Sequence, residues 1–241
     1  MKFGIRREVD FTKPDYQLSG LAGINIELAL PYKMEMFLPV QGELPSLAAA
    51  VARAGCVVQS VHAPQGHLTD EGFHDWSLAT AKFAESVGAS HVVFHPEESR
   101  QDMRVNKQIL AMRHIRQLQR ETSVTVCIET FGSKKRIFRP EEICLEELPM
   151  CLDTSHLFVD RSMQLIEKYS TYISCVHLSE ARLDESGQMK QHMPVQGYGF
   201  EILDKLLALG WNGIVTLEYL FEYHNRLIPD MLMLQDRYGG E

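Results

Sequence analysis

The sequence has no continuous apolar stretch of about 20 residues, the length that a transmembrane helix needs. Its first ten residues, MKFGIRREVD, are charged within a few positions and lack the apolar core of a signal peptide. We therefore expect no membrane partner and a cytoplasmic location. The composition, with 45% hydrophobic and 23% charged residues, is that of an ordinary globular protein rather than a disordered one.

Cysteine pairs with the CxxC spacing of zinc-thiolate or redox sites are also absent. The five cysteines are Cys56, Cys127, Cys144, Cys151 and Cys175, and four of them lie within apolar runs. This distribution predicts small, buried and reduced side chains rather than a zinc-thiolate site.

Neither GxGxxG nor GxxxxGK[ST] occurs, which counts against a nucleotide-binding loop. The chain carries 24 basic against 32 acidic residues, a net charge of −8, with no dense Lys/Arg block that could follow a phosphate backbone. Nucleic acid is therefore disfavoured as a partner. One local basic patch is expected to be a solvated loop, with contact to a single phosphate as the alternative: Lys134, Lys135, Arg136 and Arg139.

Eight short apolar runs recur along the chain, and each is continuous rather than alternating in polarity. This is the pattern of parallel strands that are covered on both faces. The runs are KFGIR from Lys2, INIELAL from Ile24, CVVQSVH from Cys56, HVVFH from His91, VTVCIETF from Val124, MCLDTSH from Met150, ISCVHLS from Ile173 and IVTLEYL from Ile214.

Helical patterns separate these runs. One begins near Pro45, places Leu47, Val51 and Ala54 on one face and ends at Gly55. A second helix is predicted from the apolar stripe Trp76, Ala79, Phe83 and Val87, which ends at Gly88. A third is predicted from Val105, Ile109, Met112 and Ile115, and a fourth runs from about Phe200 to Gly210. Alternating strands and helices over 241 residues predict one (β/α)8 TIM-barrel domain spanning residues 1–241, with an open doubly wound sheet as the alternative.

Ionisable residues near the ends of successive predicted strands favour the barrel. They are 24–41 residues apart, about one β/α unit each: Glu27, His62, His95, Glu129, Asp153, His177 and Glu218. An open sheet would place chemistry at two or three strand ends only. Burying so many ionisable groups in a barrel mouth is costly unless they are paired or bind a cation, so we expect a divalent metal such as Zn, Mn, Co or Mg.

Four residues form the core of this prediction, namely Glu129, Asp153, His177 and Glu218. For His62 and His95, a structural role and a second metal position are both open, and Glu27 is either a substrate contact or a positioning residue. His91, at a strand start, is expected to be structural. His156, three residues after Asp153, is expected to point across the top of the site. His192 lies on a long loop after the seventh strand, and Gly197 and Gly199 would let that loop fold closely over a ligand.

Several stretches resemble the xylose isomerase-like TIM-barrel superfamily, which groups sugar isomerases and epimerases with the endonuclease IV family. They are VHAP at Val61, FHP at Phe94, IET at Ile128, CLDTSH at Cys151, HLSE at His177, HMPVQGYG at His192 and LEY at Leu217. The order and spacing of these motifs are specific for the superfamily and much less so for one activity.

The resemblance implies that Glu129, Asp153, His177 and Glu218 hold a metal, and that the two glutamates exchange a substrate proton. The nuclease branch adds metals whose matching ligands here are His62, His95, His156 and His192. That branch has an aspartate two residues before the histidine matching His192. This chain has Lys190 there, and a protonated ammonium cannot be a ligand.

Together these features predict a metal-dependent isomerase or epimerase of a small sugar, sugar phosphate or related polyhydroxy compound. Glu129, Glu218 and His156 are its expected catalytic residues, and Glu27, His192, Arg182 and Lys190 contact the substrate. Three alternatives stay open: an endonuclease IV-like phosphodiesterase acting on abasic DNA, a dehydratase or lyase, and a barrel that binds metal or sugar without turnover. Assembly into a homo-oligomer is also left open.

Overall fold

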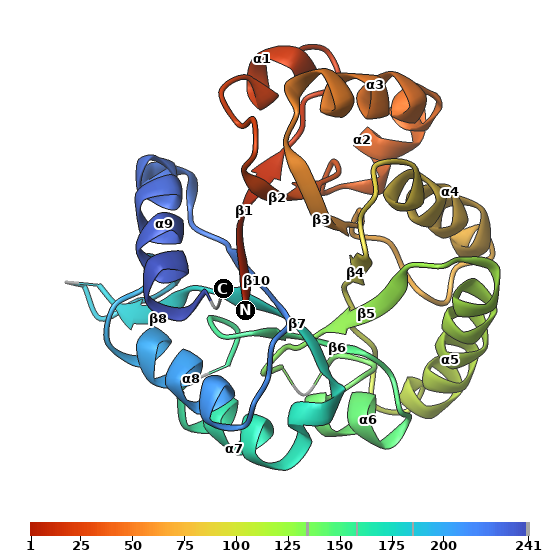
Figure 1. The fold of residues 1–241 in the computed structure, drawn as a ribbon. Coiled ribbons are helices and arrows are strands. Elements are labelled where there is room, and N and C mark those ends of the chain that lie inside the picture. The colour runs from red at the N-terminus through yellow and green to blue at the C-terminus, as the bar shows by residue number, and fades with distance from the viewer. Residues whose placement is uncertain (134, 158, 185, 240–241) are drawn as a thin grey trace. The chain divides into compact units, whose positions relative to one another are not determined.

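The computed structural model describes residues 1–133, 135–157, 159–184 and 186–239. Its main sheet is a closed barrel of eight parallel strands, which confirms the predicted TIM-barrel fold (Figure 1). The strand order is β1-β10-β7-β6-β5-β4-β3-β2. All eight predicted runs form these strands: β1 (Lys2–Glu8), β2 (Asn25–Ala29), β3 (Val57–His62), β4 (His91–Phe94), β5 (Thr125–Glu129), β6 (Met150–Asp153), β7 (Ile173–Leu178) and β10 (Ile214–Leu217).

Apart from β1, in which only three of seven residues are buried, the barrel strands are buried along most of their length, as their continuous apolar sequences predict. All four residues of β6 are buried, and so are all four residues of β10. Parallel registry aligns the ends of neighbouring strands: Asp153 of β6 lies opposite His177 of β7, and Leu217 of β10 lies opposite Leu178 of β7. Polar residues at successive strand ends are thereby brought to the same end of the sheet.

Helices fill the connections between the strands, and Figure 1 labels them along the chain. The α-helices are α1 (Pro14–Leu18), α2 (Met34–Phe37), α3 (Leu44–Ala54), α4 (Phe73–Ser86), α5 (Arg104–Glu121), α6 (Pro140–Leu145), α7 (Val159–Tyr169), α8 (Gly197–Ala208) and α9 (Leu227–Tyr238). Short 3-10 segments are η1 (Leu38–Glu43), η2 (Ser170–Tyr172) and η3 (Phe221–Arg226). The predicted stop of α3 is confirmed, because Gly55 has a φ of 66° and its N–H donates to Val51 O.

The predicted apolar stripe of α5 is partly wrong. Met112 and Ile115 are buried as expected, whereas Val105 and Ile109 are 62% and 58% exposed. The face that packs inward is completed instead by Ala111 and Leu118. Periodicity alone did not distinguish the two faces, because apolar residues lie on both.

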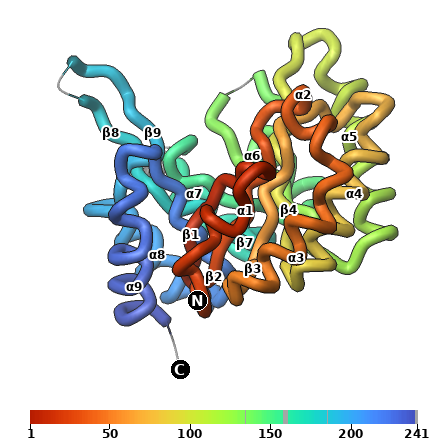
Figure 2. Tube along the Cα trace, turned by 90° about the horizontal axis from the view of Figure 1, so that it is seen from above, coloured from red at the N-terminus to blue at the C-terminus, as the bar shows by residue number. Residues whose placement is uncertain are grey.

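A two-stranded antiparallel hairpin, β8 (Glu180–Leu183) and β9 (Met189–Met193), lies between β7 and α8. It extends away from α8 and α9 in Figure 2. The sequence predicted a long loop here. Gly197 and Gly199, expected to fold that loop over a ligand, instead begin α8, where a Cβ at Gly199 would lie 2.7 Å from Val195 Cγ1. Close packing against Val195 therefore explains the glycine.

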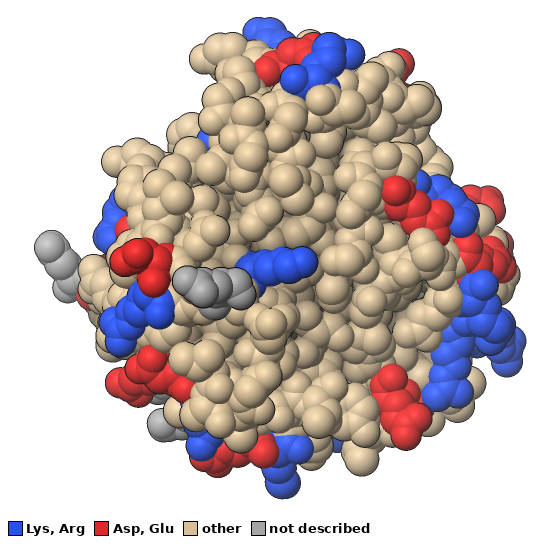
Figure 3. All heavy atoms as spheres, in the orientation of Figure 1, with Lys and Arg blue, Asp and Glu red and all other residues tan. Residues whose placement is uncertain are grey.

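The chain divides into two compact units. The first unit comprises Met1–Arg6, Glu129–Gly132 and Arg139–Glu241, and the second comprises Arg7–Ile128 and Ser133–Phe138. No helix among the described residues is both long and apolar enough to cross a membrane. The face in Figure 3 carries small groups of basic and acidic side chains, and the largest basic group lies over α5, whose exposed arginines include Arg113, Arg116 and Arg120.

Candidate active site

Four ionisable side chains of the first unit converge at strand ends. Glu129 ends β5, Asp153 ends β6, His177 lies in β7 and Glu218 directly follows β10. Each offers a ligand atom, and these atoms all lie within 4.8 Å of one another. Glu129, Asp153 and His177 are at most 1% exposed. We call these four residues the carboxylate cluster; the structure brings them together as the sequence predicted, and their binding of metal stays a prediction.

The two oxygens of Asp153 have different environments. Oδ1 accepts hydrogen bonds from Ser155 N at 2.7 Å, from Ser155 Oγ at 3.0 Å and from His156 N at 2.8 Å. Oδ2 is buried and accepts no hydrogen bond from any residue that the structure describes. Burial, together with the nearby carboxylates of Glu129 and Glu218, raises the pKa of Asp153 above its usual value, against the opposing effect of His156 and His192. An acceptor in this state is suited to a cation.

Glu218 is held from two sides. Its Oε2 lies 3.0 Å from His177 Nδ1, and its Oε1 forms an ion pair with Arg6 Nη1 of β1. Burial alone would raise the pKa of Glu218, but Arg6 and then His177 outweigh it and hold that pKa well below the usual 4.5. Glu218 is therefore an ionised and oriented carboxylate.

His156 follows β6 and reaches back over the cluster. Its Nδ1 lies 3.4 Å from Glu129 Oε1 and 3.5 Å from Asp153 Oδ2, and its ring stacks on Phe131 with centroids 4.1 Å apart. Burial disfavours its charged form, but the carboxylates of Asp153 and Glu129 prevail and raise the pKa of His156 to about 9. His156 therefore carries a proton near neutral pH.

His192 lies on β9 of the hairpin with a φ of 54°, in the left-handed region that few non-glycine residues adopt. Its Nδ1 lies 3.2 Å from Ser155 Oγ, 3.4 Å from Ser179 Oγ and 3.9 Å from Glu218 Oε1. Asp153, His156 and His192 also offer ligand atoms within 4.8 Å of one another. The hairpin thus brings His192 to the carboxylate cluster.

Arg182 and Lys190, the predicted substrate anchors, face each other across the hairpin. Arg182 donates to Glu180 Oε2 through Nε at 3.0 Å and through Nη2 at 2.7 Å, and to Pro194 O at 2.6 Å. The Lys190 Nζ lies 3.9 Å from Glu222 Oε1. The structure therefore gives Arg182 a buried carboxylate partner and Lys190 a surface one; their contact with substrate stays a prediction.

Three further candidates lie in the second unit. Glu27 of β2 is fully buried, and its Oε2 accepts a hydrogen bond from Ser60 Oγ at 2.8 Å. His62 ends β3, and its ring meets that of His95 edge to face with centroids 4.6 Å apart. His62 Nδ1 donates to Ala63 O at 3.0 Å, which leaves Nε2 as the nitrogen with a lone pair. A second metal position at His62 and His95 stays a prediction, as does the contact of Glu27 with substrate.

The sequence analysis missed Arg6 and Phe131. Arg6 could have been found from strand registry, because Ile5 pairs with Leu217 and the next residues along these parallel strands are Arg6 and Glu218. That argument requires knowledge that β1 and β10 are neighbours, which barrel closure supplies. The stacking of Phe131 on His156 has no comparable signal in the sequence.

The donor set of the carboxylate cluster fits a divalent cation. Three carboxylates and one imidazole are the oxygen and nitrogen ligands that zinc, manganese and magnesium accept. A cation would offset the mutual repulsion of the three carboxylates and would give Asp153 Oδ2 a partner. The residues that would hold it are Glu129, Asp153, His177 and Glu218.

A comparison with protein families matches residues 19–231 to the model of the xylose isomerase-like TIM barrel. The chain belongs to this family. A search of curated proteins gave no match.

Solved structures similar to this xylose isomerase-like barrel differ in activity. A D-tagatose 3-epimerase-like protein has a TM-score of 0.71 and 15% identity, with 98% of this chain and 96% of that chain covered. Endonuclease IV from Thermus thermophilus has a TM-score of 0.65 and 15% identity, with coverages of 98% and 100%. A xylose isomerase-like TIM barrel protein from Mycobacterium smegmatis, in complex with magnesium, has a TM-score of 0.65 and 14% identity, with 93% of this chain and 90% of that chain covered. At such identities the likeness shows the fold alone.

Proposed function

We propose that this xylose isomerase-like barrel is a metal-dependent isomerase or epimerase of a small sugar, sugar phosphate or related polyhydroxy compound. The observation that carries the proposal is the carboxylate cluster, in which two glutamates, an aspartate and a histidine offer ligand atoms within 4.8 Å of one another. A divalent cation bound there would supply Lewis acidity to a substrate carbonyl. The family match and the epimerase-like relative support this class of reaction.

Glu129 and Glu218 are the proposed proton carriers. In the strand order, β6 and β7 stand between β5 and β10, so Asp153 and His177 separate the two glutamates. A substrate held between them offers one face to each carboxylate. One glutamate then removes the proton next to the carbonyl, and the other returns a proton to the opposite face, which inverts the configuration of that carbon.

Other residues of the chain orient these groups. Arg6 keeps Glu218 ionised and turned toward His177. His156, fixed by its stacking on Phe131, donates a hydrogen bond to a substrate oxygen, and His192 contacts the substrate from the hairpin. Glu27 is proposed as a further substrate contact, and His62 and His95 as a second metal position.

A second candidate function is phosphodiester hydrolysis, as in endonuclease IV. The grouping of Asp153, His156 and His192 favours it, because this second set of ligand atoms could hold another cation. Lys190 speaks against it, since this ammonium stands where the nuclease branch has an aspartate and lies near Glu222. A dehydratase or lyase would use the same glutamates for proton removal, but a group on the neighbouring carbon, such as a hydroxyl leaving as water, would then be expelled.

The test is exchange of a substrate hydrogen with solvent. Metal-loaded protein is incubated in D₂O with a panel of ketoses, aldoses and their phosphates, and deuterium incorporation is followed by NMR. Incorporation next to a carbonyl, together with a new isomer, supports the proposal. Cleavage of abasic-site DNA without any exchange would replace it with the nuclease function.

A further inference from the structure

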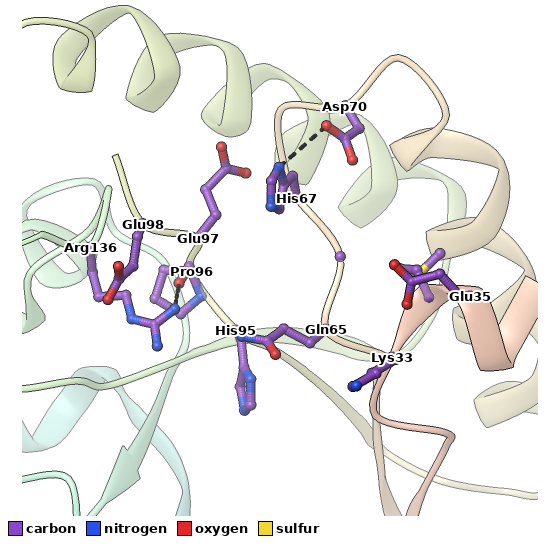
Figure 4. Close-up of a pocket in the computed structure, with 12 residues that line it drawn as sticks. Lys33, Glu35, Gln65, His67, Asp70, His95, Pro96, Glu97, Glu98 and Arg136 are labelled. Carbon is purple, nitrogen blue, oxygen red and sulfur yellow. Dashed lines mark hydrogen bonds and ion pairs between the residues drawn. The ribbon is translucent and has the colours of Figure 1, made fainter. Parts of the chain in front are cut away.

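A cavity of about 860 Å³ lies in the second unit, outside the carboxylate cluster (Figure 4). Four connections line it: Lys33 follows β2, Gln65 follows β3, His95 follows β4 and Arg136 follows β5. We call it the Lys33 cavity. We propose that the Lys33 cavity binds the anionic group, a phosphate monoester or a carboxylate, of a small polyhydroxy ligand.

Two cationic side chains line the cavity. Lys33 is exposed and forms no ion pair with a described residue. Arg136 is half-buried, and its Nη1 donates to Pro96 O at 2.8 Å, which fixes the plane of the guanidinium. Figure 4 shows Lys33, Gln65, His95 and Arg136 along one side of the space. Ammonium, guanidinium and amide N–H groups are the donors that recognise phosphate and carboxylate oxygens.

The carboxylates that line the cavity are either neutralised or at its rim. Glu97 is buried, and its Oε1 accepts from Thr69 Oγ1 at 2.5 Å and from Lys107 Nζ at 2.7 Å. In Figure 4 its side chain points away from Lys33 and Arg136. Glu35, Asp70 and Glu98 are exposed, so water and salt weaken their repulsion of a bound anion. Asp70 Oδ1 also lies 3.5 Å from His67 Nδ1.

The loops that carry the donors are bonded to one another through the backbone. Lys33 and Gln65 form a β-bridge, and Gln65 N–H donates to Tyr32 O at 2.7 Å. Glu98 and Arg136 form another, and Ile137 N–H donates to Glu97 O at 2.9 Å. Because these segments are already ordered, binding loses little conformational entropy.

The inference concerns a ligand bound within the second unit, and its test needs no turnover. Isothermal titration calorimetry measures binding of inorganic phosphate, ribose 5-phosphate, gluconate and uncharged ribose to the protein as purified. Ribose 5-phosphate carries a phosphate and gluconate carries a carboxylate, so the tighter binder of the two shows which anionic group the cavity recognises. We expect at least one anion to bind more tightly than ribose.

The variant Lys33→Gln should weaken anion binding at least about tenfold, since it removes one charge-assisted hydrogen bond. It should leave the fold intact because this ammonium pairs with no described carboxylate. Glu98→Gln should strengthen binding by removing a rim charge. The matched control is Lys82→Gln, whose ammonium pairs with Glu85 on α4 and does not line the cavity. Arg136→Lys provides a second test that keeps the charge but loses the planar guanidinium.

Gly66 also lines the cavity and lies close to the Trp76 ring, since a Cβ on Gly66 would be 2.5 Å from that ring. The fluorescence of Trp76 therefore offers an independent readout of binding. Anion binding that is equal in wild type and Lys33→Gln, or no anion binding at all, overturns the inference. If Lys33→Gln loses anion affinity but no sugar exchanges hydrogen with solvent, only the proposed function fails. If turnover persists with unchanged anion affinity, only this inference fails.

Discussion

The carboxylate cluster and the Lys33 cavity both gather charged side chains, but they differ in burial. In the cluster, Asp153 is fully buried and its Oδ2 accepts no hydrogen bond from a described residue. In the cavity, Lys33 and Glu35 are exposed and can be hydrated. A buried, unsatisfied acceptor needs a permanent partner such as a metal, whereas hydrated charges can exchange water for a passing ligand. This difference is why we propose catalysis at the cluster and ligand binding in the cavity.

The largest expected effect comes from the two glutamates that we propose as proton carriers. Glu129→Gln and Glu218→Gln should each lower turnover at least about a thousandfold, because glutamine keeps an acceptor oxygen but cannot take a proton. Substrate–solvent hydrogen exchange measures the loss, and metal content is determined in parallel. The comparison variant is Lys82→Gln, whose ammonium pairs with Glu85 on α4, and it should leave the exchange rate unchanged. Metal-loaded glutamine variants that exchange at the wild-type rate would remove both glutamates from the mechanism.

Metal removal should have the next largest effect. If the free metal concentration is about 100 times the dissociation constant, chelation should lower the free energy of unfolding by about 2.7 kcal/mol. The melting temperature should then fall by about 5–10 °C. In His177→Gln the chelator should have little further effect. Metal analysis sharpens the comparison: one ion per chain in excess zinc, unchanged in His62→Gln, would argue against a second metal position at His62 and His95.

Arg6→Gln should destabilise the protein by about 1–3 kcal/mol at pH 7, because it leaves the partly buried carboxylate of Glu218 without its cation. Since the folded-state pKa of Glu218 lies below the usual 4.5, the ion pair stabilises fully above that pH and is lost as the pH falls through the folded-state pKa. Urea unfolding of both proteins should therefore give a stability difference that shrinks below pH 4.5. A difference that is independent of pH would show that Arg6 acts through packing alone.

The smallest effects concern the hairpin. Arg182→Gln loses two hydrogen bonds to Glu180 and one to Pro194 O and should cost about 1 kcal/mol. Lys190→Gln should cost less than about 0.5 kcal/mol, because its nearest carboxylate is at 3.9 Å on the surface. Chemical denaturation measures both. A tenfold rise in KM without loss of stability in either variant would instead support the predicted role in substrate binding.

The barrel could be predicted from the sequence because strands covered on both faces, such as Met150–Asp153, are continuous apolar runs. The convergence of Glu129, Asp153 and His177 followed from the shared direction of parallel strands. The β8–β9 hairpin could not be predicted, because polar residues such as Lys190 and Gln191 resemble a loop when neither face is deeply buried. Arg6 was missed because its partner depends on which strands become neighbours when the barrel closes.

The position of the candidate residues along each β/α unit has an evolutionary consequence. Glu129 and Asp153 are the last residues of their strands, whereas Lys33, Gln65 and Arg136 lie in the loops that follow strands. Mutations in such loops seldom unfold a barrel, and insertions there are tolerated. Substitutions in these loops could therefore change which ligand is bound while the residues at the strand ends stay the same. Chains of this family that retain the cluster and differ in the loops are the natural place to look for new substrates.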